Sequence, residues 1–220
     1  MRNVDKGLLM KLRRFVNLNG LYITANELKR RAGVALRRWM LARKLRCPNI
    51  IIGPRSYLRG LGYISIGKNF QASEGLWLEA IADDGDEHSP CIKIGDNVSI
   101  SRWSHIGATN CVEIGDGVLI GSKVLITDHS HGQYSGTHTS PSIQPTLRPI
   151  ASARKVIIGR NVWLGDGVVV NPGSNIGEGS VIGANAVVTG IIPPFTLAAG
   201  IPARPLKRYS FEINEWVNLL

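Results

Sequence analysis

The sequence predicts a mainly β protein: a parallel β-helix that follows a basic helical segment. Three observations carry this prediction. An aliphatic residue followed by glycine recurs every six residues, a polar loop interrupts that repeat, and the positive charge is concentrated before it. We therefore expect a basic, partly helical arm over residues 1–60, a β-helix over 61–208 with a protruding loop at 132–156, and a short C-terminal helix over 209–220.

The N-terminal arm is strongly basic. Residues 1–60 hold 15 Lys and Arg against 2 Asp and Glu, whereas the remaining 160 residues carry a net charge of −3. The stretch ELKRRAGVALRRWMLARKLRC places apolar side chains on one helical face, namely Leu28, Ala32, Ala35, Leu36, Trp39 and Met40. A basic amphipathic helix with a tryptophan is typical of a membrane-surface or docking element. Alternatively, the apolar face packs on the following domain and the arginines are solvated. Nucleic acid is a third option, although no recognition motif is present.

The bulk composition indicates a soluble cytoplasmic protein. An apolar content of 44% and a charged content of 19% are ordinary for such a chain. No apolar run approaches the roughly 18 residues of a membrane span, and the start MRNVDKGLLMKLRR lacks the apolar region of a secretory signal. Cys47, Cys91 and Cys111 have no CxxC spacing, so we interpret them as isolated, reduced thiols.

The six-residue repeat predicts the β-helix. Its aliphatic-Gly pairs begin at Ile94, Ile106, Ile114, Ile120, Ile158, Leu164, Ile176 and Ile182. The fifth position of each hexad is small or β-branched, as at Val98, Ser104, Val162 and Ser180. This period suits a short strand and a tight corner stacked turn on turn, with the aliphatic residue inside and the small residue at the corner.

Two breaks interrupt the repeat. The segment CVE, residues 111–113, adds two residues to one hexad, and a longer excursion occupies about residues 132–156. A polar, proline-containing loop of that length inside a solenoid is usually functional. The loop leaves directly after TDHSHG, residues 127–132, which makes that motif the candidate site.

The last twelve residues, YSFEINEWVNLL, are compatible with a short helix. Ile213, Trp216, Val217 and Leu220 would share one side of it. We expect this helix to cap the end of the solenoid.

Two stretches carry a resemblance to a known family. IGRNVWLGDGVVVNPGSNIGEGSVIGANAVVTGIIPPFTLAAGIPARPLKR resembles the C-terminal signature of hexapeptide-repeat acyltransferases. TDHSHG with its SP-containing loop is similar to the O-acetyltransferases of lipopolysaccharide and capsule biosynthesis, with galactoside and maltose acetyltransferases as more distant relatives. The resemblance spans about residues 64–208 and does not explain the arm.

The resemblance implies a left-handed parallel β-helix that forms a homotrimer, with active sites between neighbouring subunits. It also implies transfer of an acetyl group from acetyl-CoA to a sugar hydroxyl in the biosynthesis of O-antigen, capsule or exopolysaccharide. The arm would hold this cytoplasmic enzyme at the inner face of the membrane, where lipid-linked sugar precursors are built.

The two histidines of TDHSHG are the candidate bases. Along a strand His129 and His131 would share a face, so the alternation does not separate them. The resemblance favours His129 as the general base, with His131 as an orienting or acceptor-contacting residue. A neutral imidazole would take the proton from the acceptor hydroxyl, an effect typically worth ~10²–10⁴ in rate.

Stacking of the coils supplies further acceptor-side candidates. An offset of 20 residues puts Thr109 beneath His129 and Asn110 beneath Ser130. Asn110 would then contact the acceptor or cap a corner, and both interpretations stay open. His105 falls at another corner of the same coil and faces either a neighbour's site or nothing. Asp128 is grouped with these orienting or acceptor-binding residues.

Cofactor positions follow from the resemblance alone. The positions matching those near the pantetheine of CoA are Trp163, Gly165, Asp166 and Ala184. Asp166 departs from the serine common there, which leaves its side-chain role open. Thr189 matches a position near the nucleotide, but Gly190 replaces the lysine of many relatives. Arg204 and Lys207 would therefore contact the nucleotide phosphates, or else form only a basic tail.

Two other functional classes compete with this prediction. A gamma-class carbonic anhydrase shares the solenoid, but it needs three zinc-binding histidines, and the spacing of His129 and His131 departs from that pattern. We therefore expect no metal. The other alternative is a non-catalytic scaffold that docks partners through its arm. None of the cysteines falls within TDHSHG, so we expect direct transfer without an acyl-enzyme.

Overall fold

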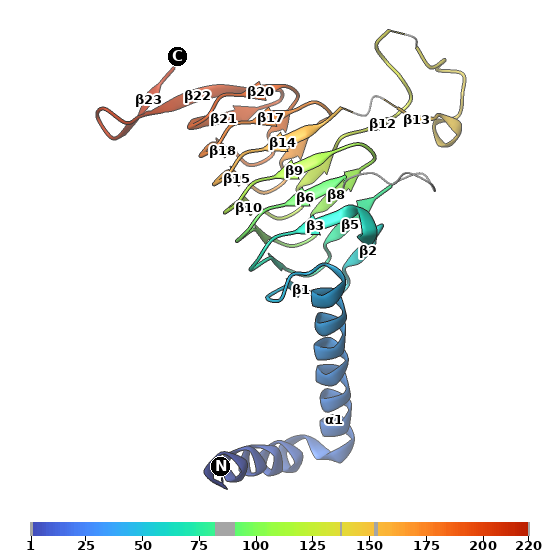
Figure 1. Ribbon diagram of the computed structural model, residues 1–220, viewed down its shortest axis with the longest axis vertical. Coiled ribbons are helices and arrows are strands. Elements are labelled where there is room, and N and C mark those ends of the chain that lie inside the picture. Colours follow the sequence, from blue (N-terminus) through green and yellow to red (C-terminus); the bar gives the residue numbers. More distant parts are fainter. Residues whose placement is uncertain (1, 82–90, 137, 152–153, 220) are drawn as a thin grey trace. The chain divides into compact units, whose positions relative to one another are not determined.

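The computed structural model describes residues 2–81, 91–136, 138–151 and 154–219 (Figure 1). It divides into two units, Met1–Leu41 and Ala42–Leu220. The first unit belongs to the helix α1 (Arg2–Lys44), and the second contains all the strands.

The helix α1 confirms that the arm is helical. Gly20 interrupts it with a φ of 77°, a conformation that glycine adopts without steric cost. On the predicted apolar face, Leu28, Leu36, Trp39 and Met40 each expose 50% or more of their surface. That face is therefore open to solvent along its length. Among the described residues, no helix combines the length and the apolarity that crossing a bilayer requires.

Three sheets form the walls of the solenoid. Sheet A contains β1 (Ile51–Ile52), β4 (Gln71–Ala72), β7 (Ser99–Ile100), β10 (Leu119–Ile120), β15 (Trp163–Leu164), β18 (Val181–Ile182), β21 (Thr196–Gly200), β22 (Ala203–Ser210) and β23 (Glu215–Asn218). Sheet B contains β2 (Tyr57–Arg59), β5 (Trp77–Ala80), β8 (His105–Ala108), β11 (Leu125–Thr127), β16 (Val169–Val170) and β19 (Val187–Val188). Sheet C contains β3 (Ile64–Ile66), β6 (Ile92–Ile94), β9 (Val112–Ile114), β14 (Val156–Ile158), β17 (Asn175–Ile176) and β20 (Ile191–Ile192).

The chain visits the sheets in turn, so that one strand from each makes a coil (Figure 1). Successive coils pair in parallel: Trp163 lies opposite Val181, which is three hexads further along the chain. The aliphatic position of the hexad points inward, and Ile106, Ile120 and Ile126 are completely buried. The repeat thus confirms the predicted parallel β-helix, because one buried residue per strand fills its interior.

Small polar residues occupy several corners, as predicted. Ser104 and Ser174 are buried, and their hydroxyls donate to the carbonyls of Gly121 at 2.9 Å and Val188 at 3.0 Å. A small side chain fits the tight bend, and its hydroxyl satisfies a backbone carbonyl that the turn would otherwise leave without a partner.

The solenoid begins earlier than predicted. Strands β1 and β2 pair with β4 and β5, so residues 51–59 belong to the β-helix and not to the arm. This first coil contains the aliphatic-Gly pair Ile52-Gly53, and Ile50 and Phe70, buried at 1% and 0% exposure, contribute to its core. A short 3₁₀ helix, η1 (Leu61–Tyr63), lies between β2 and β3.

The predicted C-terminal helix is wrong. Strand β22 turns back antiparallel on β21, and β23 pairs with β22. The rings of Tyr209 and Trp216 meet across this hairpin with centroids 5.5 Å apart, and Phe211 contacts Tyr209 from the side. An isolated helix shorter than ~12 residues is marginal, whereas strand pairing satisfies the backbone and extends sheet A. Leu220 lies outside the described residues.

The protruding loop leaves the solenoid after β11, which ends at Thr127, and the chain re-enters it at β14, which begins at Val156, where the predicted loop ends. Strands β12 (Ser130–His131) and β13 (Ile150–Ala151) pair antiparallel at its base, and residues 132–149 connect them. The loop contains the 3₁₀ helix η2 (Pro145–Leu147). The guanidinium of Arg148 ties the loop together by donating to Ile143 O at 2.9 Å, Pro141 O at 3.2 Å and Tyr134 Oη at 3.0 Å.

Candidate active site

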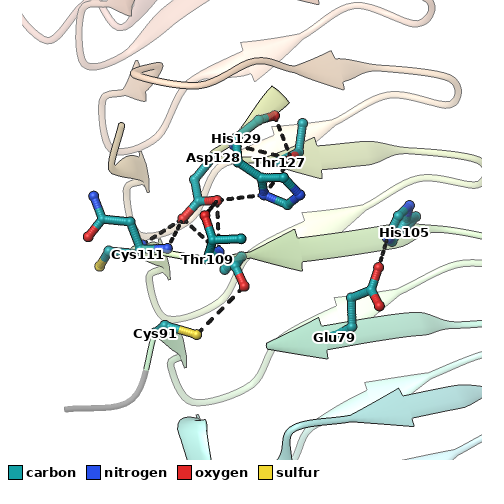
Figure 2. A network of polar contacts seen from close by, with 10 residues as sticks. Glu79, Cys91, His105, Thr109, Cys111, Thr127, Asp128 and His129 are labelled. Carbon is teal, nitrogen blue, oxygen red and sulfur yellow. Dashed lines mark hydrogen bonds and ion pairs between the residues drawn. The ribbon is translucent and has the colours of Figure 1, made fainter. Parts of the chain in front are cut away.

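The candidate site is built around a buried carboxylate. Asp128 has no exposed surface and follows β11 at the corner between sheets B and C. The backbone N–H groups of Thr109, Asn110 and Cys111 donate to its two oxygens at 3.0, 2.8 and 2.6 Å (Figure 2). These donors lie at the corner of the preceding coil that the two-residue insertion lengthens, and this corner forms a cradle for the Asp128 side chain.

The cradle keeps Asp128 ionised. Burial raises the pKa of this carboxyl, but the hydrogen bonds from His129 and from the three backbone N–H groups outweigh burial and hold the pKa below its ordinary value. A buried charge is stable only when its lone pairs are occupied, and here four donors occupy them. Asp128 therefore orients its neighbours and has no surface with which to contact an acceptor.

The Asp128 carboxylate fixes the adjacent imidazole. Nδ1 of His129 lies 2.9 Å from Asp128 Oδ1 and 3.2 Å from the Thr127 hydroxyl (Figure 2). An ionised carboxylate only accepts hydrogen bonds, so Nδ1 carries the proton and Nε2 of the neutral ring is left as an acceptor. The His129 side chain is 14% exposed. The arrangement suits a general base: one nitrogen is held and the other is unprotonated.

His131 does not share this geometry. The chain bends at Asp128, so residues 127–131 are not one continuous strand and the expected common face does not form. His131 instead lies in β12 at the base of the loop, is exposed, and accepts the Tyr134 hydroxyl through its backbone carbonyl at 2.6 Å. Within the described part of the chain, no hydrogen bond or ion pair joins its ring to another residue.

The cysteines are closer to the site than the sequence suggested. The backbone of Cys111 contacts Asp128, although the residue lies outside TDHSHG. Burial raises the pKa of the Cys111 thiol, and the charge of Glu113 raises it further. Burial, assisted by the Asp128 charge, raises the pKa of Cys91 to about 11. Both environments oppose the thiolate form that a nucleophilic cysteine needs.

His105 lies on the outward face of sheet B in the coil that precedes His129. Its Nε2 is 3.3 Å from Glu79 Oε1, and its ring stacks on Trp77 with centroids 4.2 Å apart. Figure 2 shows the Glu79–His105 pair beyond the free edge of the His129 ring. The sequence missed Glu79 and Trp77, because only strand register brings residues 26 and 28 positions away beside His105.

A pocket of about 360 Å³ opens at the same corner as His129. Its lining residues are Ser130, Tyr134, Ser135, Arg154, Asn171, Pro172 and Thr189. Thr189 is the one predicted cofactor residue among them. Arg154 enters the site because its backbone N–H donates to the Asp128 carbonyl at 2.8 Å where the loop returns to the solenoid. No motif signals this arginine in the sequence.

The other predicted cofactor residues lie away from this corner. Trp163 stands on sheet A with half of its surface exposed, and Ala184 lies exposed at the corner between sheets A and B. A Cβ at Gly165 would lie 2.7 Å from the Ala184 nitrogen, so this glycine allows the coils to stack. Within a single chain, Trp163 on sheet A and His129 at the corner between sheets B and C thus lie on different sides of the solenoid.

Asp166 has a structural partner. Its Oδ1 accepts the Ser122 backbone N–H at 2.6 Å. Asp96 and Asp116 make the same contact with the coil before them, both at 2.7 Å. The aspartate that replaces the expected serine therefore holds a corner in the way of the other Gly-Asp turns.

Arg204 and Lys207 lie on β22. Arg204 is exposed, and its guanidinium contacts the carbonyl of Ala203 at 3.1 Å. Lys207 is half-buried opposite Leu197 and Asn218. Neither lies at the corner of His129. Across the described ranges, no group of three or more His, Cys, Asp and Glu side chains is arranged to hold a metal ion.

Comparison with known proteins gives similarities in sequence and in structure. Residues 155–190 match the family described as bacterial transferase hexapeptide (six repeats). WbbJ of Escherichia coli (strain K12), named as a candidate lipopolysaccharide biosynthesis O-acetyl transferase, is 43% identical over 162 residues, which are 73% of this chain and 79% of WbbJ.

Among solved structures, AntD, an N-acyltransferase from Bacillus cereus in complex with dTDP and 3-hydroxybutyryl-CoA, superimposes with a TM-score of 0.61 at 22% identity. The match covers 76% of this chain and 84% of AntD. A variant of AntD in complex with dTDP-4-amino-4,6-dideoxyglucose and coenzyme A matches equally well, with a TM-score of 0.61. Because the sequence match to WbbJ spans most of both chains and the solved neighbours share the fold, the chain belongs to the hexapeptide-repeat acetyltransferases, which are left-handed parallel β-helix enzymes.

Proposed function

We propose that this chain transfers the acetyl group of acetyl-CoA to a sugar hydroxyl during the biosynthesis of a surface polysaccharide. The observation that carries the proposal is the 2.9 Å contact between Asp128 Oδ1 and His129 Nδ1, which leaves the other ring nitrogen free to accept a proton. The O-acetyl transferase name of WbbJ supports the reaction, and the dTDP-sugar bound to AntD supports a sugar acceptor.

The reaction follows from the free nitrogen of His129. Nε2 accepts the proton of the sugar hydroxyl while the oxygen of that hydroxyl attacks the thioester carbonyl of acetyl-CoA. The tetrahedral intermediate expels the CoA sulfur, which takes the proton back from the imidazolium. The fixed charge of Asp128 stabilises that imidazolium and holds the ring in place. The raised pKa values of Cys91 and Cys111 support direct transfer over an acyl-cysteine.

A homotrimer would complete the site. The outward faces of sheets A and B carry apolar side chains, among them Leu119 and Trp163 on one and Tyr57 and Trp77 on the other. Sheet C carries the ion pair of Lys93 and Glu113, with a 3.2 Å contact, as well as the exposed side chain of Ile191. If sheet A of one copy packs against sheet B of the next, Trp163 faces the partner's His129 corner, and a closed ring forms.

Within that assembly, CoA would run between two copies. The pocket that Thr189 lines would hold part of the cofactor from one side, although the resemblance matched Thr189 to the nucleotide end. Trp163, Gly165, Asp166 and Ala184 would line the other side through the partner copy. Arg204 and Lys207 would reach the nucleotide phosphates from β22, since both are cations near the edge of sheet A.

The arm would hold the enzyme at an anionic membrane. Helix α1 carries 12 Lys and Arg against 2 Asp and Glu, and its apolar side chains are exposed. Attraction to anionic lipid contributes on the order of 1 kcal/mol per basic residue near the surface. Such binding would keep the catalytic domain beside lipid-linked sugar precursors.

Calorimetric titration of acetyl-CoA into the purified protein tests the proposal. We expect micromolar binding that weakens in Trp163→Ala and survives in His129→Ala, because the tryptophan would contact the cofactor and the histidine the acceptor hydroxyl. Absence of binding to the unaltered protein would refute the acetyltransferase proposal. Equal binding to all three proteins would refute the role given to Trp163.

A further inference from the structure

Gly107 leaves a notch on the outward face of sheet B. In that face residue 107 lies between Glu79 of the preceding coil and Thr127 of the following one. A Cβ atom at Gly107 would lie 3.3 Å from His105 Nε2 and 3.6 Å from His129 Cε1. It would lie 3.9 Å from Glu79 Cγ. Two imidazoles and a carboxylate side chain therefore meet around this glycine, which is itself buried, so the notch is a shallow contact point and not an open cavity.

His105 is held in a fixed orientation at this notch. Glu79 binds its Nε2 at 3.3 Å, and Trp77 stacks on its ring at an interplanar angle of 17°. Tyr57 in turn meets Trp77 edge to face, with ring centroids 5.8 Å apart. The side chain of His105 nevertheless stays 32% exposed, and that of Glu79 12%. The ring is thus oriented by its neighbours and still open to a ligand.

We propose that the Glu79–His105 pair binds the acceptor by holding the hydroxyl next to the one that His129 deprotonates. The inference rests on the proposed function and specifies its substrate class. Glu79 offers a carboxylate oxygen to the hydroxyl at the rim of the notch, and His105, whose Nε2 also contacts Glu79 Oε1, borders the same hydroxyl. Because His129 borders the same notch, a pyranose brings two neighbouring hydroxyls to the two imidazoles at once. The acceptor is therefore a sugar with a free vicinal diol.

The first test fills the notch with one methyl group. Gly107 lies in β8 without a left-handed backbone, so Gly107→Ala adds a Cβ against His105 without straining the chain. Gly62→Ala is the matched control, because no heavy atom lies within 4 Å of the Cβ it would add. The probes are the p-nitrophenyl pyranosides of glucose, galactose and rhamnose. Saturation-transfer NMR measures their binding, and release of the CoA thiol measures their acetylation.

We expect Gly107→Ala, His105→Ala and Glu79→Gln each to weaken pyranoside binding roughly 10- to 100-fold, the range for a hydrogen bond to a charged group. The affinity for acetyl-CoA should be unchanged in all three variants, and Gly62→Ala should match the unaltered protein in both measurements. If these three substitutions lower kcat but leave the KM for the pyranoside unchanged, the inference is overturned.

The second test separates contact from mere structural support. A pyranoside that lacks the hydroxyl next to the acetylated one should lose roughly tenfold or more in kcat/KM with the unaltered protein. With His105→Ala the same deletion should cost almost nothing further, because its partner is already absent. Equal losses in both proteins would overturn the inference. So would a protein that binds acetyl-CoA but none of the pyranosides, whereas failure to bind acetyl-CoA would overturn the proposed function itself.

Discussion

At the scale of single residues, the site depends on the charge of Asp128. Three backbone N–H groups and the His129 ring all donate to it, so the carboxylate sets the tautomer of the proposed base. An amide has one acceptor oxygen and an NH₂ group that would face some of these donors. Charge, and not only size, is therefore required at this position.

Asp128→Asn should lower kcat by roughly 10²- to 10⁴-fold, the usual contribution of a general base. The affinity for acetyl-CoA should stay within about twofold, because the carboxylate has no exposed surface. Asp116→Asn is the matched control: it neutralises a carboxylate that also accepts a backbone N–H, at 2.7 Å, away from the candidate base. Steady-state kinetics with unchanged kcat in Asp128→Asn would refute this role.

The same residue predicts a pH dependence of stability. The pKa of Asp128 is lower in the folded protein than its ordinary value of 3.8. Its contribution to the free energy of unfolding is therefore complete above that value and is lost as the pH falls through the lower, folded pKa. Urea unfolding from about pH 7 down to about pH 3 should show this loss in the unaltered protein and a smaller loss in Asp128→Asn. If the free energy of unfolding falls equally with pH in both proteins, the stabilising role of the Asp128 charge is contradicted.

At the scale of elements, the side chain of Arg148 connects distant parts of the loop 132–149. Arg148 donates to two carbonyls and to the Tyr134 hydroxyl, and Tyr134 in turn contacts the His131 carbonyl at the hairpin base. Tyr134 also lines the pocket beside His129. Order in the loop is thereby linked to the shape of that pocket.

Arg148→Ala should leave the free energy of unfolding within about 0.5 kcal/mol, as is usual for an exposed residue, while proteases cut the loop faster. Arg160→Ala removes an exposed arginine that pairs with Glu178 on the solenoid, and it should change neither quantity. Limited proteolysis followed by mass spectrometry locates the cleavage. Unchanged cleavage within 132–149 would show that Arg148 does not order the loop.

At the scale of the whole molecule, the proposed trimer requires the apolar faces of sheets A and B. Leu119 stands outward on sheet A beside Trp163 and is 45% exposed in the single chain. Leu119→Glu should therefore give a monomer by sedimentation velocity and abolish transfer, because a buried, unpaired charge opposes association. Ile191→Glu on sheet C, where the residue is 76% exposed, should remain trimeric. A trimer of Leu119→Glu would exclude this face.

The arm predicts membrane binding by the full chain. Replacing Arg38, Arg43 and Lys44 by glutamate should weaken cosedimentation with anionic vesicles on the order of 10²-fold or more, at roughly 1 kcal/mol for each cation lost. The matched control replaces Lys68, Lys123 and Arg208, which are exposed on the solenoid. Equal losses in both variants would indicate a general charge effect, and the proposed role of the arm would fail.

How far the sequence predicts this molecule depends on whether a feature repeats. The hexad repeat predicted the buried positions Ile106, Ile120 and Ile126, since every strand of a coil needs one apolar residue that fills the interior. The first coil, whose pair Ile52-Gly53 lies ahead of the regular run of the repeat, was assigned to the arm. Apolar spacing alone suggested a helix for the C-terminal segment, whereas cross-strand ring contacts decide its structure.

The candidate site likewise has features that the sequence predicted and features that it did not. The offset of 20 residues, which the coil length predicted, holds up to the pair Thr127 and Gly107, directly before the bend at Asp128. The cradle around Asp128 was not predicted, because backbone N–H groups have no signature in side-chain identity. The Glu79–His105 pair and Arg154 were also missed, because only coil stacking or the return of a long loop brings them close.

The cradle beneath Asp128 has an evolutionary consequence. Its three donors lie at a corner of the preceding coil that is two residues longer than a regular hexad, so the base depends on a local chain length as well as on a motif. A relative that keeps the aspartate-histidine pair but shortens this corner by two residues would lose the arrangement of these donors and, we expect, its activity. In such relatives, an insertion or deletion at this corner would indicate the loss of catalysis even where the histidine is unchanged.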